Sequence, residues 1–158
     1  MSDLKLVALD GEDLEVLAAH LQDAVLLVGD MAYLPKEQRF AALVNRFDWA
    51  SALTDQNTGA NSYERRRAAL RFERVRSCQT LHLRTQAKDA VLSLLTISFE
   101  PTDAPSGYLL LTFSGGAAVR LEVDYIEATL TDLGPVWRTR LQPKHPTIES
   151  TAGAAEER

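Results

Sequence analysis

Hydrophobic and polar positions along the chain predict one early helix within a succession of strands. Residues 4 to 9 have the pattern of a short strand whose apolar side chains on both faces predict burial on both sides. Asp10 then has the chemistry of an N-cap, and apolar residues follow at i, i+3, i+4 and i+7. These residues are Leu14, Leu17, Ala18 and Leu21. We therefore expect an amphipathic helix that ends near residue 23 and packs its apolar stripe on a core.

From residue 25 onward the pattern changes to strands. Residues 25 to 35 carry apolar side chains on both faces, and Gly29-Asp30 interrupts them as a bulge or bend. A polar "KEQ" connection leads to a partner strand, and residues 51 to 62 have the composition of a surface loop. Strands are expected at 39–49, 91–99, 108–113 and 119 to about 130.

The last hairpin shows how alternation constrains strand register. Apolar residues occupy odd positions on both of its strands, so odd positions must pair with odd positions, such as Phe113 with Val119. That pairing requires an odd number of loop residues. A three-residue Gly115-Gly116-Ala117 connection satisfies the requirement, whereas a two-residue Gly-Gly turn would expose half of the apolar set.

Residues 62 to 76 are compatible with either a helix or a strand. We favour a strand, because strands surround the segment and residues 77 to 84 continue the same antiparallel run. After Asp132, "LGPVW" is expected to end the sheet, with Trp137 folding back as a hydrophobic lid. A weak internal repeat is also considered, because a "DAVL" sequence opens two strand pairs 66 residues apart, at residues 23 and 89.

These patterns predict a single α+β domain over residues 1–140, followed by a disordered tail over 141–158. In this domain an N-terminal strand and an amphipathic helix pack on a curled, mainly antiparallel sheet. The sheet forms an open barrel or a sandwich.

Composition limits the class of protein. The chain has 158 residues, of which 46% are hydrophobic and 25% charged, as in an ordinary globular domain. No apolar stretch is long enough for a membrane helix, the N-terminus has no leader pattern, and Cys78 is the single cysteine. We expect a cytoplasmic protein with no disulfide, no cofactor and no metal site.

Charge is distributed unevenly along the chain. The net charge is -5, yet residues 61–88 carry eight basic and two acidic side chains between two acidic flanks. The six arginines in twelve positions are Arg65, Arg66, Arg67, Arg71, Arg74 and Arg76. Lysine is absent from residues 61–87, and arginine favours bidentate pairing with carboxylates. We therefore predict that the acidic flanks, or those of a second copy, neutralise these arginines, and that nucleic-acid binding is not their role.

Other residues suggest weaker candidates for chemistry. His20 with Asp23 or Asp30 can form an acid–base couple. Asn45, Arg46, Asp48 and Trp49 stand at a strand end, where binding surfaces often lie. The competing interpretation is structural: His20 borders the helix–sheet contact, and Arg46 pairs locally with Asp48. Similarly, Cys78 and His82 share one face of an extended segment, but neither further metal ligands nor an oxyanion-hole signature accompany them.

Three blocks of sequence resemble one family. "HLQDAVLLVGDMAYLPKEQRF", "NRFDW" and "FSGGAAVRLEVDYIEATLTDLGPVW" are similar to the signature blocks of a family of small alphaproteobacterial proteins, classed as a domain of unknown function. The similarity extends over residues 4 to about 138. It implies a bacterial cytosolic protein and brings no catalytic residue or substrate.

Three functions are therefore weighed. We favour a non-catalytic binding or scaffold module that acts through contacts with an unidentified protein or as a homodimer. The first alternative is a small enzyme with His20, Asp23, Arg46 and Asp48 in one cleft. The second is an RNA-binding module that uses the arginines of residues 65–76.

Overall fold

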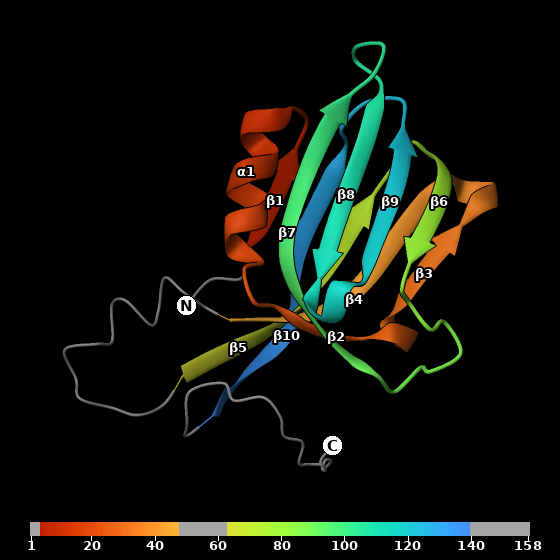
Figure 1. The fold of residues 1–158 in the computed structure, drawn as a ribbon. Helices are drawn as coiled ribbons and strands as arrows, with labels where there is room; N and C mark the ends of the chain where they lie inside the picture. Colours follow the sequence, from red (N-terminus) through yellow and green to blue (C-terminus); the bar gives the residue numbers. More distant parts are fainter. Residues whose placement is uncertain (1–3, 48–62, 140–158) are drawn as a thin grey trace.

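The computed structural model describes residues 4–47 and 63–139, which form a sheet-dominated α+β fold (Figure 1). In this part of the chain a single α-helix accompanies ten strands, and every recorded strand pair is antiparallel. The elements are β1 (Lys5–Ala8), α1 (Gly11–His20), β2 (Val25–Leu27), β3 (Met31–Leu34), β4 (Arg39–Phe47), β5 (Tyr63–Phe72), β6 (Val75–Leu81), β7 (Val91–Pro101), β8 (Gly107–Phe113), β9 (Ala118–Val123) and β10 (Ala128–Thr139).

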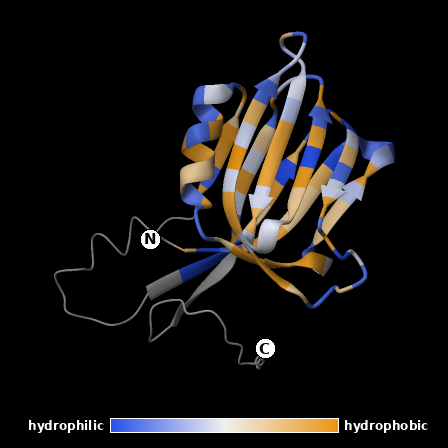
Figure 2. Cartoon of the chain, viewed as in Figure 1, coloured by the Kyte–Doolittle hydropathy of each residue, from blue (hydrophilic) through white to orange (hydrophobic). Residues whose placement is uncertain are grey.

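The sheet curls without closing. Its strand order is β1-β10-β5-β4-β2-β7-β8-β9-β6, and β3 pairs with β4 beside this path. The layer made by β7, β8, β9 and β6 lies over β4, β5 and β10 (Figure 1). Hydrophobic and hydrophilic residues alternate along the strands (Figure 2), and the apolar faces of both layers share one core. Fully buried members of this core include Leu70, Phe72, Leu109, Leu121 and Leu130.

The helix α1 begins as expected. The Asp10 side chain accepts a hydrogen bond from the Asp13 backbone N–H at 2.8 Å, and Leu14 and Leu17 are buried. The helix ends at His20, earlier than expected, and the backbone of Asp23 has a positive φ of 63°. The expectation that both faces of β1 are buried is wrong: Ala8 is fully buried, but Val7, on the other face of this end strand, is 52% exposed.

Two short 3-10 turns shape the region between α1 and β4. The interruption at Gly29-Asp30 is a turn over Val28–Asp30 rather than a bulge, and it separates β2 from β3. The second turn, Pro35–Glu37, joins β3 to its partner β4 and ends at Gln38 in the left-handed region. The expected strand pair with a polar connection is thus confirmed.

The basic segment is extended, as favoured, but it does not form one antiparallel run. β5 pairs with β10 and β4, whereas β6 pairs with β9 in the other layer. Between them the chain turns a corner at Arg74, whose φ is 61°. The continuation expected through residues 77–84 is therefore wrong, because β6 leaves the layer of β5 at this corner.

The expected strand from residue 119 to about 130 is also divided. β9 ends at Val123, and β10 starts at Ala128 in the opposite layer. Two backbone hydrogen bonds, from the Asp124 N–H to the Arg74 carbonyl and from the Glu73 N–H to the Glu127 carbonyl, join the connection to the β5–β6 corner. Both chain segments thus cross between the layers side by side, which local alternation does not reveal.

The sheet does not end at "LGPVW". β10 continues to Thr139, and Trp137 pairs in register with Arg65 on β5. The Gly134-Pro135 pair lies within a register shift between Asp132 and Val136. The strand accommodates the two residues as an irregularity and then resumes, so the expectation that the sheet ends before Trp137 is wrong.

The β8–β9 hairpin has the predicted parity but a different loop. Leu111 pairs with Val119, and the Phe113 N–H donates to the Ala117 carbonyl at 2.8 Å, so the three loop residues are 114 to 116. Gly115 and Gly116 have φ values of 75° and 81°. The predicted loop would have required such a conformation near Ala117, whose Cβ disfavours it. The loop therefore lies one position earlier, and Phe113 lies opposite Ala117 rather than the predicted Val119.

The two "DAVL" segments meet in the fold. Leu26 of β2 lies opposite Leu92 of β7 in an antiparallel pair. An ancestral repeat nevertheless stays a prediction. The loop expected at 51–62 and the tail expected at 141–158 lie outside the described residues.

Candidate functional site

The basic segment places its arginines in two different environments. Arg65 and Arg66, on the first part of β5, are buried, whereas Arg71, Arg74 and Arg76, around the corner between β5 and β6, are exposed. Arg67 lies between these extremes. The two groups are referred to below as the buried end and the exposed end of the segment.

Asp132 is the centre of the buried end. Its carboxylate accepts a bidentate pair of hydrogen bonds from Arg46, with Nε to Oδ1 at 2.9 Å and Nη2 to Oδ2 at 3.0 Å. The Leu4 backbone N–H donates to Oδ2 at 2.8 Å, and Arg66 Nε lies 3.9 Å from the same atom. This carboxylate thereby connects β1, β4, β5 and β10 at one end of the core.

These contacts keep Asp132 ionised. Burial by itself would raise the pKa of the Asp132 carboxyl. The hydrogen bonds from Arg46 and Leu4 and the charges of Arg46 and Arg66 outweigh burial, so the pKa is lowered from its ordinary value. Asp132 therefore acts as a fixed counterion for the two buried guanidinium groups.

Arg65 and Arg67 extend the polar cluster on the other face of β4 and β5. Arg65 Nη1 donates to the Asn45 carbonyl at 3.2 Å, and its guanidinium lies 5.8 Å from the centre of the Phe47 ring. Burial lowers the pKa of Arg65, while the charge of Asp23 opposes that shift. Arg67 donates to Asn45 Oδ1 at 3.4 Å and lies 4.0 Å from Asp30.

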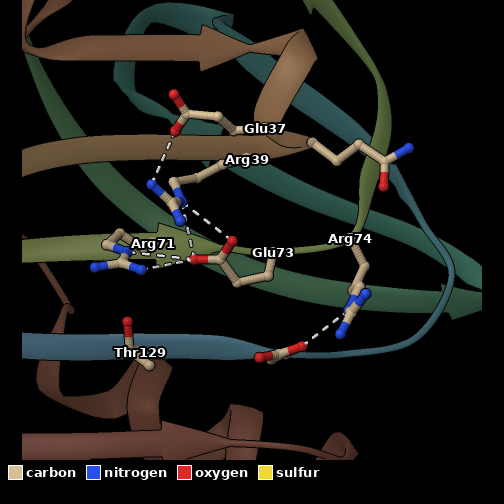
Figure 3. A pocket seen from close by; sticks show the side chains of 8 residues that line it. Glu37, Arg39, Arg71, Glu73, Arg74 and Thr129 are labelled. Atoms are coloured by element: carbon tan, nitrogen blue, oxygen red, sulfur yellow. Dashed lines mark hydrogen bonds and ion pairs between the residues drawn. The ribbon is translucent and has the colours of Figure 1, made fainter.

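Arg71 and Arg74 of the exposed end line an open pocket of about 330 Å³ at the layer corner. Glu73 lies between Arg39 and Arg71 in this pocket (Figure 3). Arg39 Nε is 3.0 Å from Glu73 Oε2, Arg71 Nη2 is 3.0 Å from the same oxygen, and Arg39 Nη1 is 3.0 Å from Glu37. Cationic and anionic groups alternate along the wall, so the pocket is not a cationic site.

The remaining two arginines pair with carboxylates of the β9–β10 connection. Arg74 donates to Glu127 at 3.2 Å and lies 5.5 Å from the Tyr125 ring centre, and Arg76 donates to Asp124. Hydrogen bonding to these carboxylates raises the pKa of both guanidinium groups.

Carboxylate pairing is thus confirmed for most of the basic segment. Four arginines form an ion pair with a carboxylate of one of the acidic flanks: Arg66, Arg67, Arg74 and Arg76. Arg71 instead uses Glu73, which belongs to the basic segment itself. Phosphate groups would have to displace these carboxylates.

The candidate catalytic residues lie in separate local environments. His20 Nδ1 lies 3.0 Å from the carbonyl oxygen of Val16. The charge of Asp23 acts on the guanidinium of Arg65, and Arg46 is hydrogen-bonded to Asp132. Over residues 4–47 and 63–139, no hydrogen bond or ion pair connects His20, Asp23 and Arg46 with one another. Asp48 and Trp49 lie outside the described residues.

Cys78 and His82 show no accompanying metal ligands in the described part of the chain, where no group of three or more histidine, cysteine or acidic residues could hold an ion. Cys78 is half-buried, and burial raises the pKa of its thiol. His82 is exposed, with a φ of 53°.

Sequence reasoning missed two features. Asp132 is the buried counterion, and a signal existed, because it continues the core-facing alternation of Ala128 and Leu130 as a charged residue. The second feature is a surface, described next, whose residues come from four strands.

This second feature is the outward surface of β7, β8, β9 and β6, called here the front face. Its side chains alternate with buried residues such as Leu109 and Leu121. They comprise Thr96, Ser98, Glu100, Tyr108, Leu110, Thr112, Ala118, Arg120, Glu122, Ser77, Gln79 and Leu81. The Arg120 guanidinium lies 4.5 Å from the Tyr108 ring centre, and Arg120 Nε donates to Gln79 at 2.9 Å.

The comparisons with known proteins define the family. The family described as "Protein of unknown function (DUF2948)" matches residues 4–145, and the chain belongs to it. The expected membership of a family of unknown function is thereby confirmed. No curated protein and no solved structure matches the chain. Among the described helices, none has the length and apolar character needed to cross a bilayer.

Proposed function

We propose that this chain is a non-catalytic cytosolic binding module that acts through protein contacts on its front face. The observation that supports this proposal best is the stack of Arg120 on Tyr108, within a surface whose other charged residues are Glu100 and Glu122. Leu110 is 38% exposed beside this pair, and Leu81 is 56% exposed at the rim. Arginine and tyrosine are enriched among the residues that dominate protein interfaces, and large apolar contacts supply the surrounding burial.

The state of the basic segment supports protein contact over polyanion binding. Its exposed arginines are engaged with carboxylates, and the pocket that Arg71 and Arg74 line is also lined by three carboxylates, Glu37, Glu73 and Glu127. Those carboxylates repel a phosphate backbone. An enzyme receives less support, because His20, Asp23 and Arg46 each contact different groups.

The proposal is tested by comparing three forms of the chain in cross-linked capture from the native cytosol. The test variant is Tyr108→Ala with Arg120→Ala, which removes the stack. The matched control is Val7→Ala with Val16→Ala, which trims exposed apolar residues on β1 and α1, away from the front face. Thermal unfolding checks that all three remain folded.

We expect specific proteins, or a second copy of the chain, to be retained by the wild type and the control and lost with the test variant. If the same set is retained by all three forms, the front face does not bind them and the proposal is overturned. If the wild type retains no specific protein, it is overturned as well.

A further inference from the structure

Three strands of the described sheet have one neighbour each. β1 pairs only with β10, β3 only with β4, and β6 only with β9 among the described residues. The free side of such an edge strand presents backbone N–H and C=O groups that can pair with another strand.

The edges differ in how well they are protected. β1 has four residues, carries the charged Lys5 and packs against α1 (Figure 1). β3 also has four residues. β6 has seven residues, and from Ser77 to Leu81 it carries no charge and no proline. Charged side chains and proline are the usual means of blocking an edge, so β6 is the least protected of the three.

One hydrogen bond shows which backbone groups of β6 face outward. The Phe113 N–H of β8 donates to the Ala117 carbonyl, so the backbone groups of odd-numbered β9 residues face β8 and those of Arg120 face β6. Gln79 lies opposite Arg120, beyond the register shift between Val75 and Ser77, so its backbone groups face β9. Backbone groups of successive residues alternate between the two sides of a strand. The N–H and C=O groups of Cys78 and Thr80 therefore point to the free side, while those of Gln79 point to β9.

The second half of β6 also stands clear of the core. Thr80 pairs with Val119, which is 1% exposed, so its side chain lies on the core-facing side of the strand. Nevertheless Gln79, Thr80 and Leu81 are all exposed. Both faces of this stretch, as well as its free edge, are thus accessible.

We propose that the free edge of β6 pairs antiparallel with β6 of a second copy of this chain. With a two-fold axis at Gln79, the backbone groups of Cys78 in one copy lie opposite those of Thr80 in the other. Identical edges are self-complementary in this arrangement. Because Ser77–Leu81 is uncharged, no like charges oppose each other across the new pair.

The arrangement deepens the proposed function and rests on it. Gln79 and Leu81 belong to the front face as well as to the edge strand. Edge pairing would join the two front faces into one continuous surface across the dimer axis. The module would then present Tyr108 and Arg120 twice to a partner.

The test uses the whole chain and removes a single backbone N–H group. Thr80→Pro removes the N–H that points to the free side and leaves the ladder between β6 and β9 intact, because the Thr80 N–H does not face β9. Thr80→Ala changes the same side chain and keeps the N–H, so it is the matched control. Sedimentation equilibrium over a wide range of concentrations measures the dissociation constant of each form, and circular dichroism verifies folding.

We expect the wild type and Thr80→Ala to form dimers with similar affinity. Two N–H groups are lost per dimer of Thr80→Pro, so its dimers should dissociate roughly tenfold more readily or more. Amide exchange at Cys78 and Thr80 should slow as the wild-type concentration rises. A wild type that remains monomeric, or a Thr80→Pro variant that dimerises like Thr80→Ala, would overturn the proposal.

This outcome is distinguishable from a failure of the proposed function. Loss of dimers with Thr80→Pro, together with unchanged capture by the Tyr108 and Arg120 variant, would leave the edge pairing and reject the front face. If the wild type remains monomeric but captures specific proteins that the Tyr108 and Arg120 variant loses, the front face is kept and the edge pairing is rejected.

Discussion

The two ends of the basic segment use the same residue type under opposite physical conditions. At the buried end, Arg46 and Arg66 share the carboxylate of Asp132, whose side chain is 1% exposed. At the exposed end, Arg71 contacts Glu73 with 47% of its side chain exposed. The Arg46–Asp132 and Arg71–Glu73 pairs are both at hydrogen-bond distance, but water solvates only the Arg71–Glu73 pair.

The degree of burial decides how much stability is lost when one partner of an ion pair is removed. Removal of one partner from a buried pair leaves an uncompensated charge where water cannot reach it, which is strongly destabilising. An exposed pair loses little, because water and salt replace the missing partner. The arginines of one short run are therefore expected to differ widely in their effect on stability.

Asp132→Asn should have the largest effect. The substitution keeps the shape of the side chain but removes the charge that balances Arg46 and Arg66. We expect the free energy of unfolding to fall by about 3–5 kcal/mol, measured by urea denaturation. Asp124→Asn, at the exposed end, is the control and should unfold like the wild type; equal effects of the two substitutions would contradict the distinction between the ends.

The contribution of Asp132 should also depend on pH. Its pKa is lower in the folded chain than its ordinary value of 3.8. A group with a depressed folded pKa stabilises the fold above its unfolded pKa, and this stabilisation is lost as the pH falls through the folded pKa. The stability difference between the wild type and Asp132→Asn should therefore be constant near neutral pH and shrink progressively below pH 3.8. A difference that stays constant down to strongly acidic pH would show that the carboxylate charge is not its source.

Arg71→Gln should have a much smaller effect. It removes an exposed contact to Glu73, which keeps its hydrogen bonds from Arg39. The expected loss is less than about 1 kcal/mol, and it should diminish further as salt is added. The same urea titration at two salt concentrations measures both quantities. A loss as large as that of Asp132→Asn would indicate that the exposed pocket is structural.

We expect RNA binding by the exposed arginines to be undetectable, which is the smallest of the predicted effects. The carboxylates that neutralise Arg71, Arg74 and Arg76 compete with phosphate groups. In filter binding with single-stranded and duplex RNA, we expect no complex at physiological salt and no steep dependence on salt at lower concentrations. Tight binding that weakens steeply with added salt would instead show that phosphate displaces the carboxylates.

Local alternation was sufficient to predict much of the fold. It indicated the Asp10 cap, the early helix, most of the strands and the odd loop between β8 and β9, because these depend on residues close in sequence. It could not indicate the corner at which β5 passes to β6 and β9 passes to β10. That corner depends on hydrogen bonds between Glu73 and Glu127 and between Arg74 and Asp124, which are far apart in the chain.

The amino-acid sequence by itself determined the charge balance of this protein: a basic segment between acidic flanks, rich in arginine and poor in lysine. Only the tertiary structure decided which carboxylate each arginine meets and which pairs are shielded from water. Asp132 is 86 residues from Arg46 in sequence, and the two meet because β10 and β4 both flank β5. Sequence fixes the number of charges, but their energies depend on burial and distance, which only the folded chain defines.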